Sequence, residues 1–139
     1  MNNLIVLGIT FAVGIMLVFN AHAAGDVTKG KAAYAVCQAC HGADGMGNKA
    51  LNSPQIAGQS HWYLKRQLKN FKAGIRGANS KDKYGMQMRP MALTLPNDQA
   101  VEDMAAYVSS MPVKPVPATV QGDVEAGKKS YMLCQACHG

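Results

Sequence analysis

The sequence predicts an all-α protein with a small core. Three segments carry apolar residues at helical spacing, and no stretch alternates apolar and polar residues for long enough to indicate a sheet. The 139 residues are 48% hydrophobic but only 6% aromatic, which limits the core that they can build. Domains with a core of this size usually need a metal, a cofactor or crosslinks to hold them together.

The first helix is expected to begin after Asp26, whose carboxylate can cap its first turn, and to run into Cys40. Within it, Gly30, Tyr34 and Cys37 are spaced to share one face. This predicted face therefore presents a glycine, an aromatic ring and a thiol.

The second helix is expected to follow Ser60, which can cap it, and to end at Gly74. Leu64, Leu68 and Phe71 fall at i, i+4 and i+7, so they form an apolar stripe along one side.

The third helix is expected to be capped by Asn97 and closed by Pro112. Its apolar stripe consists of Val101, Met104, Ala105 and Val108. The segments 42–59 and 74–95 are rich in Gly, Asn, Ser and Pro, and both are expected to be long loops. Loops of this length in a small domain usually wrap around something or have a function.

Residues 1–23 are expected to be a secretory signal peptide. Leu4 to Phe19 is a mostly apolar run, and Ala21-His22-Ala23 is a small-x-small cleavage signal. We expect cleavage after Ala23 and export of the mature protein. The alternative is an uncleaved anchor, although the apolar run falls just short of the roughly 17–25 residues that span a membrane.

The formal net charge is +6, and its pattern argues against nucleic acid as a partner. Lysines and arginines are scattered, with no arginine-rich stripe interleaved with aromatic residues. An electrostatically steered encounter with an acidic protein or an anionic membrane surface fits an exported protein better. A solvated basic face with no single partner remains the alternative interpretation.

The chain contains an internal repeat. Gly25 to Gly42 and Gly122 to Gly139 are identical at 12 of 18 positions. Between them, residues 112–121 form a proline-rich linker. We therefore expect one domain at 24–111 and the start of a second, truncated copy at 122–139, as in a fragment of a duplicated protein.

Both copies carry the same short motif, and it uses all four cysteines. The two motifs are Cys37-Gln38-Ala39-Cys40-His41 and Cys134-Gln135-Ala136-Cys137-His138. C-x-x-C-H is the attachment pattern for c-type haem. On one turn of helix the two thiols can reach both vinyl groups of a porphyrin, and the histidine can then ligate the iron.

Three other interpretations of the motif are weaker. A thioredoxin-like redox pair needs a βαβ context, which the sequence does not predict. A zinc site could use two C-x-x-C pairs, but here they lie in separate copies, each with its own histidine. A structural disulfide suits an exported protein, yet only two residues between the cysteines would make a strained bridge.

The iron would need a second axial ligand or an open site. His61 is the only histidine outside the signal peptide and the two motifs, and its place at the head of a helix favours a surface or capping role. Met86, Met88 and Met91 lie together just before the third helix, and a methionine ligand raises the iron potential. Each could instead fill a gap in the core, or the group could capture copper.

The stretch 24–111 resembles a class I cytochrome c domain of the cytochrome c4 type, a family of bacterial periplasmic carriers built of two such domains in tandem. The motifs that carry the resemblance are Ala24-Gly25-Asp26, Cys37-x-x-Cys40-His41-Gly42, Ala57-Gly58-Gln59, Tyr63-Leu64, Gln67-Leu68, Phe71-Lys72-Ala73-Gly74-x-Arg76, Met88-x-Pro90-Met91 and Ala105-Ala106-Tyr107.

The resemblance implies an all-α, class I cytochrome c fold, with helices wrapped around a covalently bound haem. It implies that Cys37 and Cys40 form the thioethers, that His41 is the proximal ligand and that Met88 is the distal ligand, with Met91 packing nearby. It also implies that Gly30 and Tyr34 cross Tyr107 on the last helix. A second haem would use Cys134, Cys137 and His138.

The implied function is electron transfer, not catalysis. The expected donor is a quinol-oxidising complex and the expected acceptor is a terminal oxidase or reductase. Two alternatives stay open: a haem subunit of a larger enzyme such as a sulfide-oxidising flavocytochrome, and a peroxidase or gas sensor with an open distal site.

Overall fold

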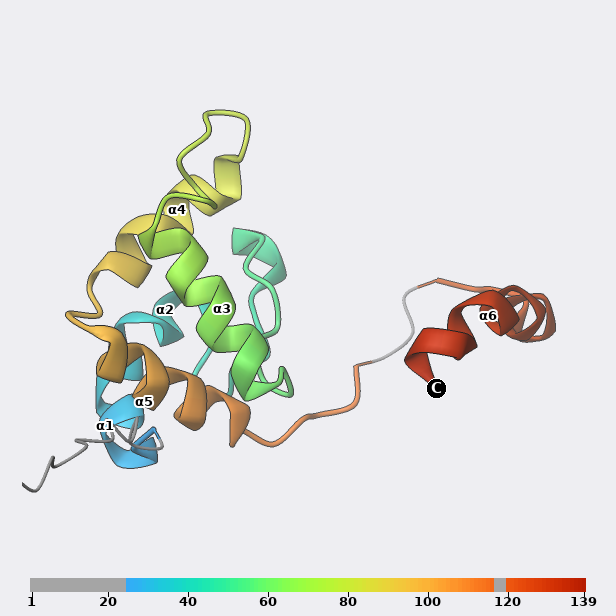
Figure 1. Ribbon diagram of the computed structural model, residues 1–139, viewed down its shortest axis with the longest axis horizontal. Coiled ribbons are helices and arrows are strands. Elements are labelled where there is room, and N and C mark those ends of the chain that lie inside the picture. The colour runs from blue at the N-terminus through green and yellow to red at the C-terminus, as the bar shows by residue number, and fades with distance from the viewer. Residues whose placement is uncertain (1–24, 117–119) are drawn as a thin grey trace, which may run out of the picture.

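The computed structural model describes residues 25–116 and 120–139 (Figure 1). The predicted signal peptide at 1–23 and its cleavage site lie outside the described residues. Regular structure in the described part is helical, apart from one isolated bridge between Asn48 and Ser53. The predicted all-α fold is therefore confirmed.

The first predicted helix consists of three short segments. These are α1 (Val27–Ala33), the 3₁₀ turn η1 (Tyr34–Val36) and α2 (Gln38–His41). Asp26 caps α1 as predicted, since its Oδ1 accepts from the backbone N–H groups of Thr28 and Lys29 at 2.9 and 3.1 Å. The expectation of one continuous helix into Cys40 is wrong, because the backbone tightens into a 3₁₀ turn at Tyr34–Val36 and α-helical geometry resumes only at Gln38.

Helix α3 (His61–Lys72) follows Ser60 and ends just before Gly74, close to the predicted bounds. The Ser60 side chain makes no capping hydrogen bond, so this part of the prediction is wrong. Gly74 has a φ of 74°, a left-handed conformation that favours glycine after a helix. The loop before α3 holds only the 3₁₀ turn η2 (Lys49–Leu51).

Helix α4 (Lys83–Leu93) occupies a segment that the sequence predicts as loop, so that prediction is wrong. Gly85 and Pro90 disfavour a helix there. Asp82 offsets this by capping the helix, since its Oδ1 accepts from the N–H of Gly85 at 2.9 Å. Packing against α3 supplies the remaining support.

Helix α5 (Asp98–Ser109) forms the centre of the core. Asn97 caps it, accepting from the N–H of Ala100 at 2.9 Å, as predicted. The predicted apolar stripe is buried throughout: Val101, Met104, Ala105 and Val108 are at most 3% exposed. This helix packs against both α1 and α3.

The crossing of α1 and α5 depends on a glycine. A Cβ on Gly30 would overlap the carbonyl oxygen of Asp103, so only glycine allows this approach. One turn further, Tyr34 meets Tyr107 edge to face, with ring centroids 5.3 Å apart. The predicted contact of Gly30 and Tyr34 with Tyr107 is confirmed.

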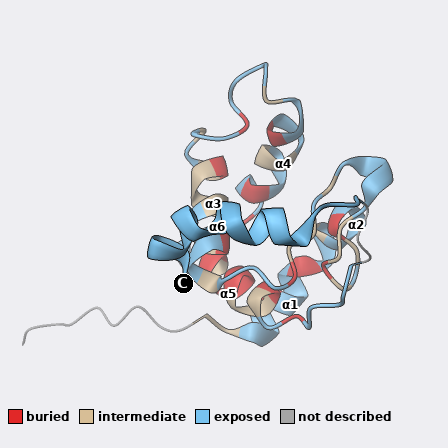
Figure 2. Ribbon diagram, turned by 90° about the vertical axis from the view of Figure 1, so that its right-hand side faces the viewer, coloured by how far each residue is buried: buried red, intermediate tan, exposed pale blue. Residues whose placement is uncertain are grey.

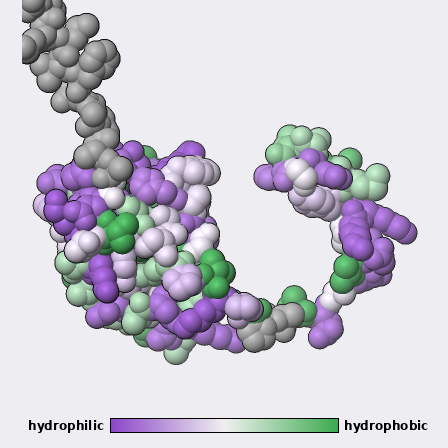
Figure 3. All heavy atoms as spheres, turned by 90° about the horizontal axis from the view of Figure 1, so that it is seen from below, coloured by the Kyte–Doolittle hydropathy of each residue, from purple (hydrophilic) through white to green (hydrophobic). Residues whose placement is uncertain are grey.

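Helix α6 (Val124–His138) carries the second copy of the motif and lies apart from the other helices (Figure 1). Every residue from 120 to 139 is exposed, as Figure 2 shows along the whole helix. Its apolar side chains also lie at the surface, Leu133 being 90% exposed (Figure 3). Among the described residues, no helix is both long and apolar enough to span a bilayer.

Candidate haem-binding cavity

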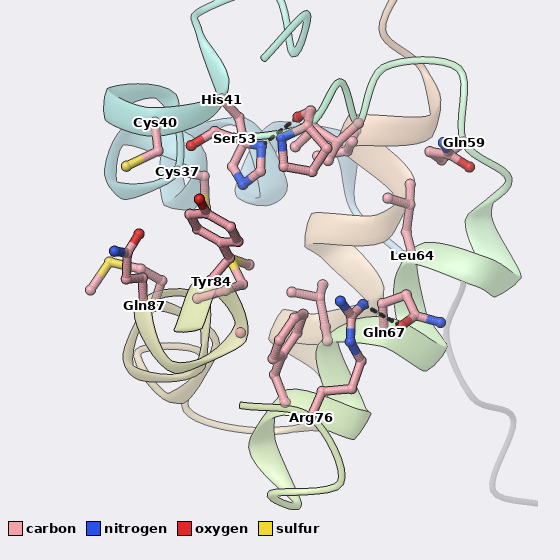
Figure 4. A pocket seen from close by; sticks show the side chains of 18 of the residues that line it. Cys37, Cys40, His41, Ser53, Gln59, Leu64, Gln67, Arg76, Tyr84 and Gln87 are labelled. Atoms are coloured by element: carbon pink, nitrogen blue, oxygen red, sulfur yellow. Dashed lines mark hydrogen bonds between the residues drawn. The ribbon is translucent and has the colours of Figure 1, made fainter. Parts of the chain in front are cut away.

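A cavity of about 520 Å³ lies between α2, α3, α4, α5 and the loop that follows α2 (Figure 4). This volume is in the range of known cofactor sites, roughly 300–1,000 Å³. Its lining is largely apolar. The apolar residues from the helices include Leu64, Leu68, Phe71, Met104, Ala105 and Val108.

Cys37, Cys40 and His41 all line one side of this cavity. Both thiols are free and come from a single helical turn, Cys37 half-buried and Cys40 exposed. Burial raises the pKa of the Cys37 thiol, with a smaller contribution from Cys40. The two thiols lie at the wall of an apolar cavity, in the place where a thioether-linked cofactor would be attached.

The imidazole of His41 is held by a backbone carbonyl. His41 is buried, and its Nδ1 lies 2.9 Å from the carbonyl oxygen of Pro54. A carbonyl can only accept, so in the neutral ring Nδ1 carries the proton and Nε2 has its lone pair free. Figure 4 shows the ring at the cavity edge with this hydrogen bond. Such an outer contact is typical of metal-ligating histidines.

Tyr34 fixes the chain directly after His41. Its hydroxyl donates to the carbonyl oxygen of Gly42 at 2.8 Å. Burial raises the pKa of Tyr34 to about 12, so the hydroxyl stays protonated and remains a donor over the physiological range. The contact holds the turn that brings the imidazole to the cavity.

Helix α4 presents its methionines unequally. Met88 and Met91, together with Tyr84, line the cavity, because their spacing places them on one helix face. Met86 is 47% exposed and is not among the lining residues. Of the three methionines of α4 near the third predicted helix, two therefore line the cavity and Met86 does not, a distinction that spacing along the sequence did not make.

Two other groups of candidate residues lie elsewhere. His61 does not line the cavity; its Nε2 is 3.3 Å from Oε2 of Glu102 on α5, in line with the expected surface role. The second motif lies exposed on α6 and does not join the first. Its residues are Cys134, Cys137 and His138.

Sequence reasoning missed several residues of the site. Tyr84 could have been found, because it lies four residues before Met88 and so shares its helix face. Pro54 could not, because its contact with His41 depends on the path of a loop. Gln67 and Arg76 belong to the motifs of the family resemblance, which gave them no role, yet both line the cavity.

The residues present fit a haem attached through two thioethers. One imidazole nitrogen and thioether sulfurs face an apolar cavity, with two thiols at its wall. The described part of the chain contains no group of three or more His, Cys, Asp or Glu side chains that could hold a metal ion by themselves. This donor set suits an iron already held in a porphyrin better than a free cation.

Comparison with known proteins gives consistent matches. The family model for cytochrome c matches residues 27–112. A cytochrome c4 of Azotobacter vinelandii is 38% identical over 130 residues, which cover 85% of this chain and 60% of the relative. Cytochrome c-554(548) of Halomonas halodenitrificans is 40% identical over 88 residues, covering 63% of this chain and 98% of the relative.

A solved structure is similar as well. The crystal structure of reduced recombinant cytochrome c4 from Pseudomonas stutzeri matches with a TM-score of 0.52 and 44% identity. The match covers 64% of this chain and 47% of the solved one. The chain thus spans about 60% of the Azotobacter relative and about half of the solved structure.

Proposed function

The chain belongs to the cytochrome c family, and from this we propose that it carries single electrons through a covalently bound haem. The haem supplies an iron that takes up and releases one electron. The protein makes and breaks no substrate bonds, so it is a carrier and not an enzyme. We further propose that it works in the periplasm, after export by the predicted signal peptide.

The residues of the cavity divide into attachment and ligation. Cys37 and Cys40 would form the two thioether bonds from one helical turn. His41 would bind the iron through Nε2, whose lone pair the Pro54 contact leaves free. The apolar lining would exclude water and lower the local dielectric, which strengthens every electrostatic effect on the iron.

Met88 would supply a sulfur as the second protein ligand of the iron. It lines the cavity from α4, is half-buried, and matches the first methionine of the family's M-x-x-M pattern. Met91 shares its face and would pack beside it. A methionine opposite a histidine raises the reduction potential, which suits a carrier that feeds an oxidising acceptor.

One observation supports this proposal above the others: the His41 imidazole is buried and oriented by a backbone carbonyl at the wall of an apolar cavity. A cysteine pair kept for redox or disulfide chemistry gives no reason for this arrangement. Metal binding explains the arrangement, because a ligating histidine is usually oriented by a hydrogen bond to one ring nitrogen while the other nitrogen binds the metal.

We propose the same roles for the second motif, with thioethers at Cys134 and Cys137 and ligation by His138. All three residues are exposed on α6. A haem there would therefore need an apolar wall from groups other than α6 itself.

The proposed partners are redox proteins, with a quinol-oxidising complex as donor and a terminal oxidase or reductase as acceptor. The net charge of +6 would steer encounters with acidic partners or an anionic membrane surface. Nucleic acid is not a proposed partner.

The proposal is tested by producing the chain with periplasmic haem attachment and measuring its haem content by mass and its reduction potential. We expect covalent haem and a reversible one-electron couple. Met88→Ala should lower the potential by on the order of 100 mV and let the reduced protein bind carbon monoxide.

Met86→Ala is the matched control, since that thioether lies outside the cavity, and it should change neither property. If the reduced protein binds carbon monoxide in Met91→Ala but not in Met88→Ala, the iron ligand is Met91 and not Met88. A chain without covalent haem would end the electron-carrier proposal.

A further inference from the structure

The outer face of α3 carries side chains that the proposed haem site does not use. Leu64 and Gln67 line the cavity from the inner face of this helix (Figure 4). Helical spacing places a second group of residues on the side that turns away from the cavity. A surface groove on that side is lined by Trp62, Lys65, Arg66, Lys69 and Asn70.

Trp62 is the only tryptophan of the chain, and it is 63% exposed. Tryptophan is on average among the more buried side chains, because its large apolar ring favours leaving water. The core of the domain is built from other residues, which include Val101 and Met104. The indole ring is therefore available to a partner at the surface.

The rest of the groove is mainly basic. Lys65 pairs with Glu102 on α5, and Nζ of Lys69 lies 2.6 Å from Oδ2 of Asp98 on the same helix. Each ammonium group has three donors, so one carboxylate leaves others free. Arg66 is exposed and makes no ion pair with another described residue. Because the groove is lined by three cations and no carboxylate, it is complementary to an acidic surface.

An aromatic pair connects this groove with the cavity. The rings of Trp62 and Tyr63 meet edge to face, with centroids 6.0 Å apart and planes at 86°. Tyr63 lines the cavity, whereas Trp62 lines the groove. Two packed rings thus lead from the exposed face of α3 to the cavity wall, and electrons tunnel more readily through packed groups than through solvent.

We propose that the outer face of α3 docks a one-electron redox protein with an acidic surface, and that the electron crosses by way of Trp62 and Tyr63. This inference rests on the proposed function and gives it a partner surface. When the partner is the donor, its metal centre loses one electron and the haem iron gains that electron. The two rings provide the path and undergo no net oxidation or reduction.

The composition of the groove favours a protein over a membrane as the partner. Tryptophan and arginine are the residues most enriched at the energetic centres of protein interfaces. A helix that lies on a membrane needs a broad apolar face instead. The groove offers a single large apolar side chain, Trp62, among cations and one amide.

Binding is tested on the haem-loaded full chain by ¹H–¹⁵N NMR. Because the chain has one tryptophan, one indole N–H signal reports on this face. The probe is a cadmium-substituted blue-copper protein with an acidic surface patch, which can dock but cannot exchange an electron. We expect the indole signal to shift until saturation, with an affinity that falls as salt is added. An unchanged indole signal would overturn the docking surface.

Electron transfer is tested by stopped-flow reduction with the copper(I) form of the same probe. We expect Trp62→Leu to lower the second-order rate constant about tenfold, while Trp62→Phe keeps a ring and most of the rate. Arg66→Gln should lower the rate constant about threefold. Lys31→Gln is its matched control, because it removes one exposed positive charge from α1, and it should stay near the wild-type rate.

Two results would overturn the proposal. Ascorbate needs no protein docking, so its rate of haem reduction should be the same in all variants. If Trp62→Leu slows ascorbate as much as it slows the copper protein, the substitution acts on the haem site and not on docking. If Lys31→Gln slows the copper protein as much as Arg66→Gln does, only the overall charge matters.

Vesicles of phosphatidylglycerol and phosphatidylcholine test the membrane as the partner. If Trp62→Leu abolishes sedimentation with these vesicles and leaves the rate with the copper protein unchanged, the face binds a membrane and the proposal is wrong. Each of these results leaves the electron carrier intact, provided the wild type holds covalent haem that ascorbate reduces. A wild type without covalent haem would instead overturn the proposed function itself.

Discussion

At the scale of single residues, burial decides what a hydrogen bond contributes. Tyr34 and Tyr131 hold corresponding positions in the two copies of the repeat. Each hydroxyl donates to the carbonyl oxygen of a glycine eight residues later, and both distances are 2.8 Å. Tyr34 is 2% exposed, whereas Tyr131 lies on an exposed helix. The same local contact is shielded from water in one copy and open to it in the other.

We predict that Tyr34→Phe lowers the free energy of unfolding by about 1 kcal/mol, because it leaves the Gly42 carbonyl without its buried donor. Tyr131→Phe is the matched control and should change stability by less than about 0.5 kcal/mol. Urea unfolding followed by circular dichroism measures both. Equal losses in the two variants would show that burial does not set the difference.

The same tyrosine gives a prediction for alkaline pH. Burial raises the pKa of Tyr34 to about 12, above its ordinary value of 10.0, so the unfolded chain loses this proton first. The contribution of Tyr34 to stability is therefore complete below pH 10 and is lost as the pH rises to about 12. The stability difference between wild type and Tyr34→Phe should shrink over that interval. A constant difference would contradict the raised pKa.

At the scale of helices, the repeat shows how packing changes a local conformation. Asp26 and Asp123 cap their helices in the same way, each through Oδ1 and two backbone N–H groups. Beyond the caps the copies differ, because 34–36 forms a 3₁₀ turn while the corresponding residues of α6 stay α-helical. The first copy packs against α5, whereas the second is exposed. The 3₁₀ turn is therefore found in the copy that has tertiary contacts.

The two copies also provide a matched pair of helical glycines. Gly30 lies at the crossing with α5, where a Cβ would overlap the Asp103 carbonyl, whereas a Cβ on Gly127 would have no neighbour within 4 Å. We predict that Gly30→Ala destabilises the folded domain by about 2–3 kcal/mol through overpacking. Gly127→Ala should leave it unchanged, or favour α6 by roughly 0.5–1 kcal/mol.

Urea midpoints of the two variants check this prediction. If Gly30→Ala unfolds at the wild-type midpoint, the helices can move apart freely and the close crossing is not required. If Gly127→Ala is as harmful as Gly30→Ala, α6 has a packing partner.

At the scale of the whole molecule, residues 25–116 and α6 differ in what supports them. The first part has a core that includes Val101 and Ala105, both fully buried. Helix α6 has 15 residues and none of them is buried. A helix of this length without tertiary contacts is only marginally stable in water.

We predict that hydrogen exchange separates these two parts. Backbone amides of α5 should be protected close to the limit set by global unfolding, while those of α6 should exchange near the rate of an unfolded peptide. Mass spectrometry of peptides from 98–109 and 124–138 measures both. Strong protection of α6 would contradict the exposure of its residues.

Features that depend on a few neighbouring residues could be predicted from the sequence alone. The caps at Asp26 and Asn97, the apolar stripe of α5, and the thiol and imidazole donors of the C-x-x-C-H motif are all read from short spacings. These features follow from helix geometry and side-chain chemistry, which act over one or two turns. The family and the all-α fold could therefore be predicted without a structure.

Which of these groups lie together became clear from the folded chain. It showed that 83–93 is a helix despite Gly85 and Pro90, which turns Met88 toward the cavity and Met86 away from it. It also brought Pro54 to His41 and Arg76 to the cavity wall. Burial and such distant contacts arise when separate segments pack against one another, and no local spacing records how they do so.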